Sequence, residues 1–437
     1  MIQFIMEEKK KILNLCYDKW DEETHTFKYN GGDKFVMDFQ HLLLHFQLET
    51  KEQNKFEIKS HNLSEVYFRP DLNFYYPIAH GNIDIINLFV ENEEKAIEKF
   101  EKSPLSDEVI ECLHKCKNLK VIIVTEHEPD YESGFVRLLE YLDLKNLDHK
   151  QFYVINNNEK LNDLKKKYNS EINVHTLHFI AHSSNFSLTN AGGCEWIEDK
   201  KGKLFMCFNK TPKHHRYALL CFLKKNNLLD DINWSLVPPW DCFPINHYYN
   251  KIFTEEQKKY FDTEINFFND IKFKRSDMEE NENWFNKFQE PNTEGFPSWM
   301  RIPEFGMNYE NSYVNIVTES KFFDELFVTH ISEKSYRPFF YYQLPMILAT
   351  QYHIKTMKEK YNFDFFDDII NHNYDNEPNQ MRRLEMFVNE IKRLSKMKDE
   401  IKEFYKNNKQ RFEDNKQRVW GMLDIVEKDY QFFESLI

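Results

Sequence analysis

A short helix predicted to begin at Ser332 combines the residue types that bind a phosphate group. It follows a predicted strand over residues 314–317. The N-terminus of a helix offers unpaired backbone N–H groups and partial positive charge, and both favour an anion. Lys334 and Arg337 add formal charge, and a guanidinium can hold a phosphate through two parallel hydrogen bonds. Glu333 can accept hydrogen bonds from a ribose. We therefore expect a nucleotide diphosphate to bind here, at the carboxyl end of a parallel sheet.

An acidic loop follows a second predicted strand, residues 121–124, and is the candidate source of a general base. Loops at the carboxyl ends of parallel strands face the ligand crevice, and a partly buried carboxylate can remove a proton from an attacking hydroxyl. The alternative interpretation is a solvated acidic surface loop. We rank the three candidate glutamates in the order Glu128, Glu126 and Glu132.

Several well-known catalytic patterns are absent from the sequence. It contains no GxGxxG, no P-loop, no HExxH and no GxSxG. No two aspartates are spaced Asp-x-Asp, the pair with which metal-dependent nucleotide-sugar enzymes usually hold their ion. We therefore expect a mechanism that requires no metal and no cofactor.

Composition and charge exclude other classes. The 437 residues include 58 Lys and Arg against 72 Asp and Glu, a net charge of −14 that argues against nucleic-acid binding by bulk electrostatics. The hydrophobic fraction of 41% is that of a folded protein. The seven cysteines form no C-x-x-C pair, which favours a reducing compartment. No apolar run suits a signal peptide or a membrane span, so we expect a cytoplasmic protein.

The elements that must position these residues alternate between strands and helices along the chain. Buried strands are predicted at 119–125, 151–156 and 172–177, and Ser106 is a good N-cap for a helix over 107–117. Strands that alternate with helices indicate parallel βαβ units. The sequence therefore predicts an α/β protein.

A second alternation begins at residue 203, and amphipathic helices dominate from Met381 onward. Residues 240–312 are aromatic, acidic and irregular, and no element is predicted there. The segments predicted in this half are a strand at 203–209, a helix at 213–226, an extended piece at 234–237, and strands at 313–319 and 346–349. We expect three parts: an acceptor-side domain over 1–200, a nucleotide-sugar-binding domain over 201–410, and a helix over 411–437 that packs back on the first domain.

The C-terminal half resembles the donor half of viral and bacterial glycosyltransferases that have two facing Rossmann-like domains (the GT-B type), and more distantly a fucosyltransferase. The resemblance depends on motifs in a fixed order: Phe208 to Arg216, Thr318-Glu319, Ser332 to Pro338, Pro345 to Leu348, Asn362 to Phe366, Tyr374-Asp375 and Arg382-Arg383. Lysines stand at two arginine positions of the first motif, and Ser335 replaces a threonine. Asn362 and Ala349-Thr350 stand where the family often has glycine.

The resemblance implies a glycosyltransferase that uses a UDP- or GDP-sugar and no metal. Lys210, Arg216, Lys334 and Arg337 would neutralise the pyrophosphate leaving group. The acceptor is either a glycan or a 5-hydroxymethylpyrimidine in viral or phage DNA. A non-catalytic α/β binding or scaffold protein is the alternative. The resemblance assigns donor binding to ten positions: Asn209, Lys210, Arg216, Thr318, Glu319, Ser332, Glu333, Lys334, Ser335 and Arg337.

Overall fold

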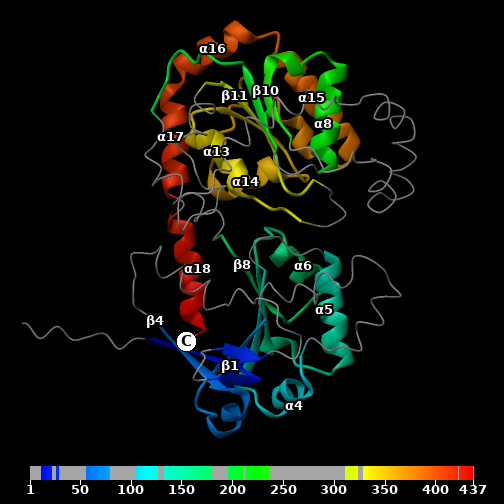
Figure 1. Cartoon of the computed structure of the whole chain (residues 1–437), viewed down its shortest axis with the longest axis vertical. Helices are drawn as coiled ribbons and strands as arrows, with labels where there is room; N and C mark the ends of the chain where they lie inside the picture. The colour runs from blue at the N-terminus through cyan, green and yellow to red at the C-terminus, as the bar shows by residue number, and fades with distance from the viewer. Residues whose placement is uncertain are drawn as a thin grey trace, which may run out of the picture. The chain divides into compact units, whose positions relative to one another are not determined.

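The chain folds into two compact units, each built on a parallel β-sheet (Figure 1). The structure is a computed structural model, and it describes residues 11–21, 26–28, 56–78, 105–125, 132–178, 195–209, 213–236, 311–322, 328–421 and 423–436. Unit 1 contains the described residues up to 178, Val328 and residues 423–436. Unit 2 contains residues 195–322 and 329–421 as far as they are described.

Unit 1 has a six-stranded parallel sheet in the order β4-β1-β5-β6-β7-β8. The order reverses beside β1, whose neighbours are β4 on one side and β5 on the other. A separate antiparallel pair is formed by β2 and β3. The strands are β1 (Lys11–Tyr17), β2 (Lys19–Asp21), β3 (Thr26–Lys28), β4 (Phe56–Asn62), β5 (Phe74–Ile78), β6 (Leu119–Thr125), β7 (Phe152–Asn156) and β8 (Asn173–Thr176).

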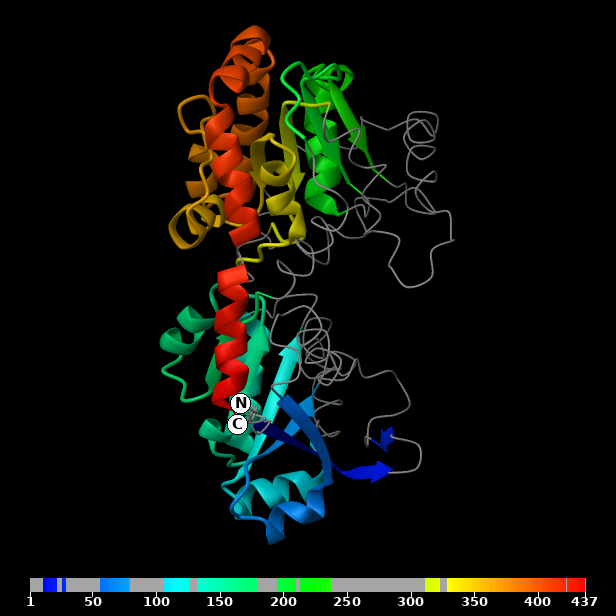
Figure 2. The same ribbon diagram turned by 90° about the vertical axis from the view of Figure 1, so that its left-hand side faces the viewer.

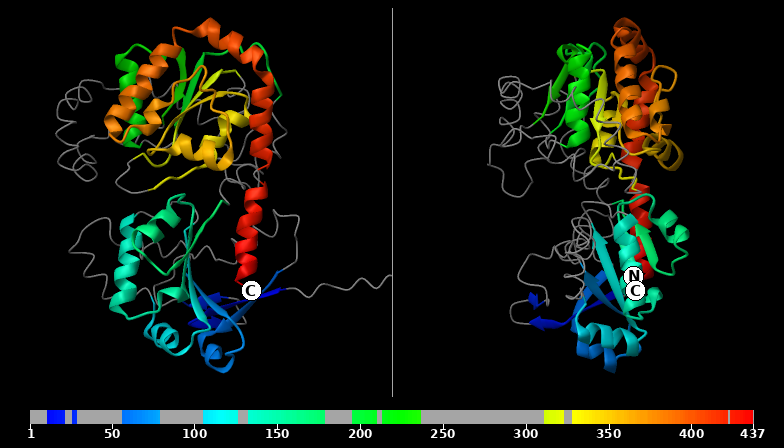
Figure 3. Two further views of the ribbon diagram at one scale, coloured as in Figure 1. Left: turned by 180° about the vertical axis from the view of Figure 1, so that it is seen from behind. Right: turned by 90° about the vertical axis from the view of Figure 1, so that its right-hand side faces the viewer.

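Helices cover both faces of this sheet, because the strands are apolar on both faces. One core joins alternate strand residues to α4 (Asp107–Lys115), α5 (Glu132–Leu144) and α6 (Leu161–Lys167). The other core joins the remaining strand residues to α18 (Leu423–Ser435), the last helix of the chain. In Figure 3, α18 is the red helix that ends at the label C. Short 3-10 turns are η1 (Leu63–Phe68) and η3 (His149–Gln151).

Unit 2 has a four-stranded parallel sheet in the order β10-β9-β11-β12. Its strands are β9 (Phe205–Phe208), β10 (Ile232–Ser235), β11 (Val314–Thr318) and β12 (Leu344–Leu348). The chain passes from β9 to β10 on one side and then returns to β11 on the other. The strand order therefore reverses between β9 and β11, and such a switch point is where ligands bind in open α/β sheets.

The helices of unit 2 lie around this sheet (Figure 2). Helix α13 contacts β11, β12 and α17, while α8 contacts α15. Their bounds are α8 (His214–Lys225), α13 (Glu333–Phe340), α14 (His353–Tyr361), α15 (Gln380–Leu394), α16 (Lys398–Asn407) and α17 (Lys409–Gly421), with 3-10 turns η4 (Leu229–Asp231) and η7 (Asn373–Asn376). Within the described ranges no helix is long and apolar enough to cross a membrane.

The predicted α/β class with two parallel sheets and C-terminal helices is confirmed. The predicted strand at 119–125 coincides with β6, and Ser106 caps α4 by accepting a hydrogen bond from the Val109 N–H. The extended piece predicted at 234–237 forms earlier, as β10. Strands β1, β4 and β5 were not predicted. Most of the unassigned segment 240–312 lies outside the described residues.

Candidate functional site

The candidate site of unit 2 begins where β9 and β11 end, on the two sides of the switch point. Asn209 follows β9, and Thr318 is the last residue of β11. The Thr318 hydroxyl donates a hydrogen bond to the side-chain oxygen of Asn209, and both residues are buried. The Asn209 N–H in turn donates to the carbonyl of Ser235, 3.0 Å away. These contacts fix the ends of three neighbouring strands to one another.

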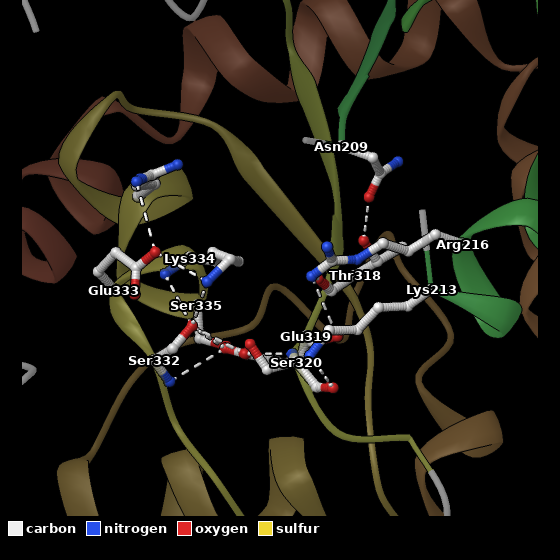
Figure 4. Close-up of polar contacts among 11 residues, drawn as sticks. Asn209, Lys213, Arg216, Thr318, Glu319, Ser320, Ser332, Glu333, Lys334 and Ser335 are labelled. Carbon is white, nitrogen blue, oxygen red and sulfur yellow. Dashed lines mark hydrogen bonds and ion pairs between the residues drawn. The ribbon is translucent and has the colours of Figure 1, made fainter. Parts of the chain in front are cut away.

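The carboxylate of Glu319 joins β11 to the first turn of α13 (Figure 4). Glu319 is fully buried. The backbone N–H of Ser332 donates to Oε1 over 3.1 Å, and the Ser332 hydroxyl lies 2.8 Å from Oε2. The Ser335 hydroxyl lies 2.5 Å from Oε1. A single buried side chain therefore holds the helix start against the end of the strand.

Glu319 is ionised in this setting. Burial alone would raise its pKa, but the positive charge of Lys334 and the nearby His353 and His330 outweigh that effect. The hydrogen bond from Ser335 lowers the pKa further, and the net result is a pKa well below the usual range of a glutamate. The carboxylate is already occupied by protein donors, so we assign it a positioning role.

Helix α13 carries two cations, Lys334 in its first turn and Arg337 further along. Ser332 is the N-cap, and its hydroxyl accepts a hydrogen bond from the Lys334 N–H over 3.3 Å. The Lys334 ammonium lies 2.8 Å from Oε1 of Glu333, and the Arg337 guanidinium lies 3.5 Å from the same oxygen. These two cationic side chains are 30% and 26% exposed, so each combines a protein partner with access to solvent.

Side chains at the start of α8 contact backbone carbonyl groups at the same end of β11. The guanidinium of Arg216 donates to the carbonyl oxygen of Thr318 over 3.2 Å, and His215 Nε2 lies 2.8 Å from the carbonyl oxygen of Glu319. The Lys213 ammonium donates to the carbonyl oxygen of Ser320 over 3.1 Å. Both predicted cationic segments therefore meet at residues 318–320, although Arg216 is buried against carbonyl groups.

Of the ten positions implied for donor binding, nine lie among the described residues, and Lys210 lies outside them. The nine described residues form two groups that differ in solvent exposure. Asn209, Arg216, Thr318, Glu319, Ser332 and Ser335 are buried. Glu333, Lys334 and Arg337 keep solvent access. The geometry thus divides the set into residues that build the site and residues that can contact a ligand.

The candidate general bases lie in unit 1. Glu126 and Glu128 are outside the described residues. Glu132 stands at the start of α5, where it accepts hydrogen bonds from the Lys167 ammonium and the Tyr168 hydroxyl. Burial raises the pKa of Glu132, but these two hydrogen bonds and the Lys167 charge lower it overall. The Glu132 carboxylate is therefore ionised and engaged in a surface ion pair.

The sequence analysis did not single out Asp18, a carboxylate directly after β1 at the switch point of unit 1. Its two oxygens accept hydrogen bonds from the Tyr76 hydroxyl and the Ser106 hydroxyl, each 2.7 Å away. Asp18 is only partly buried. A polar residue directly after the first apolar strand was the signal that could have identified it.

His353, the first residue of α14, and Asp375 complete the structure around the site. His353 Nε2 lies 2.9 Å from the Ser335 hydroxyl. The carboxylate of Asp375 accepts hydrogen bonds from the N–H groups of Ile354 and Lys355, each over 3.0 Å. Asp375 therefore caps the start of α14. Among the residues that the structure describes, no group of three or more His, Cys, Asp or Glu is arranged to hold a metal ion.

No protein-family model and no curated protein matches the chain. A similar solved structure is that of the DNA-modifying enzyme β-glucosyltransferase, determined in the presence and absence of the substrate uridine diphosphoglucose. It is 12% identical, covers 95% of this chain and 99% of that chain, and has a TM-score of 0.33.

Proposed function

We propose that the protein is a metal-independent glycosyltransferase that moves a sugar from a nucleoside diphosphate donor to a hydroxyl group. One observation carries the proposal: the two segments that resemble donor-binding motifs, 208–216 and 332–338, meet at Glu319 beside the switch point of the sheet. Switch points of parallel sheets are the usual ligand sites of this architecture. The sequence resemblance supplies the reaction class.

The proposed reaction depends on stabilising the negative charge that develops on the leaving group. The acceptor oxygen bonds to the anomeric carbon, the bond from that carbon to the phosphate oxygen breaks, and the nucleoside diphosphate leaves with the electron pair. Lys334, Arg337 and the start of α13 stabilise the negative charge that develops on the leaving group. Glu333 accepts hydrogen bonds from the ribose. Arg216 supports the site by holding the carbonyl groups at the end of β11.

The proton of the acceptor hydroxyl passes to a carboxylate that acts as general base. We retain the ranking Glu128, Glu126, Glu132, and add Asp18 as a fourth candidate because of its place at the switch point. The ion pair of Glu132 with Lys167 weakens the case for Glu132. Replacing each carboxylate singly by its amide tests them, since loss of the base lowers turnover by about 10²–10⁴-fold without a matching loss of donor binding.

The acceptor is a glycan or the hydroxymethyl group of a modified pyrimidine in DNA. A DNA acceptor needs a basic surface, but two cations of the C-terminal helices are already paired with carboxylates. Lys406 forms an ion pair with Asp199, and Arg411 pairs with Asp364 and Asp368. Binding to duplex DNA that weakens steeply with rising salt would support the DNA acceptor. No binding to duplex DNA at low salt would leave a glycan as the proposed acceptor.

The function is tested with a panel of UDP- and GDP-sugars in the presence of EDTA. We expect one of them to release its nucleoside diphosphate, slowly to water and faster when a hydroxyl acceptor is supplied. Stabilisation by a nucleoside diphosphate without any release would support a binding protein. Neither stabilisation nor release would support a scaffold protein and would overturn the proposal.

A further inference from the structure

Tyr352 has an unusual backbone conformation at the edge of the candidate site. It lies between β12 and α14, with φ of 65° and ψ of 18°, in the left-handed region that bulky side chains rarely adopt. Such strain persists only where the surrounding structure over-determines it, and it concentrates at ligand-binding positions. Tyr352 is therefore a candidate for a role that the fold alone does not require.

The other non-glycine residues with positive φ in the described ranges have an evident reason for it. Four of the seven are asparagines, which tolerate this conformation. Tyr342 and Phe366 are aromatic, but they are 5% and 0% exposed, so burial of the ring offsets the backbone cost. The Tyr352 residue is 41% exposed. Its backbone has the same unfavourable conformation, but its ring is not buried in the core, so burial does not offset the cost.

The backbone on either side of Tyr352 is held firmly. Its own N–H donates to the carbonyl oxygen of Asp375 over 2.9 Å. The N–H groups of Ile354 and Lys355, two and three residues further along the chain, donate to the Asp375 carboxylate. These bonds fix the backbone at Tyr352 and the direction of its Cα–Cβ bond, so ligand binding does not have to order the backbone there.

Tyr352 is one of the exposed large hydrophobic residues in the described part of the chain. The Lys355 ammonium lies 5.3 Å from the ring centroid, and within the described parts of the chain no aromatic side chain pairs with Tyr352. An exposed aromatic face with a neighbouring cation can stack on another planar π-system.

Tyr352 belongs to the same edge of the sheet as the phosphate-binding cations. It follows β12, the neighbour of β11 in the sheet. The next residue, His353, contacts the Ser335 hydroxyl, which also binds Glu319. Two side chains, those of His353 and Ser335, therefore link the backbone beside Tyr352 to the helix that carries Lys334.

We propose that Tyr352 is the stacking surface for the base of the nucleoside diphosphate. This inference rests on the proposed function and adds a base-binding residue to it. The pyrophosphate lies at the start of α13, and the base stacks on the Tyr352 ring. Stacking on an aromatic side chain tolerates any base, because every nucleobase has a π-face. Tyr352 accordingly contributes to affinity for a nucleotide over inorganic pyrophosphate.

The test is calorimetric titration of the full-length protein with UDP, GDP and inorganic pyrophosphate in EDTA. Tyr352→Ala is expected to weaken binding of the preferred nucleoside diphosphate by about 5- to 150-fold, the range of one base–aromatic stack. Pyrophosphate affinity is expected to change less than twofold. Tyr352→Phe is expected to bind like the wild type, since it keeps the ring.

Two further variants separate stacking from folding. Tyr352→Asn suits the left-handed conformation, so it is expected to unfold at the wild-type temperature or above while losing nucleotide affinity as Tyr352→Ala does. Phe68→Ala removes a ring that is 81% exposed in unit 1 and is expected to change nothing.

The outcomes are distinguishable. Nucleotide binding by the wild type with equal affinity in Tyr352→Ala and Tyr352→Asn would overturn the stacking role and leave the proposed function standing. A parallel loss of pyrophosphate binding would also overturn it, since that result indicates damage to the phosphate site. A wild type that binds no nucleoside diphosphate would overturn the proposed function, and the stacking role with it.

Discussion

Ser335 and Glu319 are joined by a hydrogen bond of 2.5 Å between the serine hydroxyl and the buried carboxylate. This bond connects the first turn of α13 to the residue that follows β11. Because Ser332 donates to the same carboxylate through its N–H and its hydroxyl, the position of the helix start depends on one ionised side chain. Glu319 therefore also sets the positions of Lys334 and Arg337, the two site cations on α13.

The first prediction concerns that carboxylate. Glu319→Gln keeps the shape of the side chain but removes the charge and turns one acceptor into a donor that faces serine donors. We expect unfolding free energy to fall by about 2–4 kcal/mol in urea at pH 7. Glu403→Gln, at an exposed position on α16, is the matched control and is expected to change stability by less than about 0.5 kcal/mol. Equal effects of the two would contradict the assignment.

The second prediction is the pH dependence of the same difference. The folded-state pKa of Glu319 lies below that of the unfolded chain, so its stabilisation is fully present above about pH 5. That stabilisation is lost as the pH falls toward the folded-state pKa. The stability gap between wild type and Glu319→Gln should therefore narrow from pH 5 to pH 3 in urea unfolding. A gap that stays constant over this range would show that folding does not change the pKa of Glu319, and a gap that widens would show that folding raises it.

The third prediction concerns the attachment of α18 to unit 1. The fully buried carboxylate of Asp429 accepts hydrogen bonds from His175 Nε2 over 2.7 Å and from the His178 N–H over 2.8 Å. Asp429→Asn should lower the unfolding free energy of unit 1 by about 1–3 kcal/mol. Glu434→Gln on the same helix removes an exposed ion pair with Lys11 and should cost less than about 1 kcal/mol. The reverse order of the two effects would refute this account of the helix.

The fourth prediction uses two glycines of unit 2. A Cβ at Gly202 would lie 2.6 Å from the carbonyl oxygen of Asn311, which accepts a hydrogen bond from the Gly202 N–H. Gly202→Ala should therefore destabilise the protein by about 1–3 kcal/mol. A Cβ at Gly421, at the end of α17, would meet nothing within 4 Å, so Gly421→Ala should be neutral or stabilising by up to about 1 kcal/mol. Thermal unfolding of both variants tests this prediction. A change in stability of the same sign in both variants would contradict it.

How well each strand could be predicted depended on its burial. Strand β6 is an apolar run with many β-branched residues, buried between helices, and the sequence predicts its bounds. Strand β4 carries polar residues because it lies at the edge of the sheet, so its apolar pattern is weak. Strand β5 contains Pro77, which argues against a central strand, yet pairing with β1 ends at Tyr75 and leaves the proline tolerated.

The candidate site was predictable in its segments but not in the direction of its side chains. The start of α13 and the end of β11 follow from the Ser332 cap and the strand before it. The sequence shows that Arg216 is cationic, but not that its guanidinium turns toward backbone carbonyl groups. The left-handed conformation of Tyr352 also has no local signal, because it depends on Asp375, which lies 23 positions further along the chain.

The most direct test of the central claim is the binding of UDP and GDP, measured by titration calorimetry in EDTA, to the wild type and to Lys334→Ala, Arg337→Ala and Lys396→Ala. Each cation that contacts the pyrophosphate contributes a charge-assisted hydrogen bond of about 1.5–3 kcal/mol. The account predicts that the wild type binds one nucleoside diphosphate without metal, that Lys334→Ala and Arg337→Ala each weaken it at least about tenfold, and that Lys396→Ala, at an exposed position after α15, binds normally. A wild type that binds neither nucleotide, or variants at 334 and 337 that bind as tightly as it does, would contradict the claim.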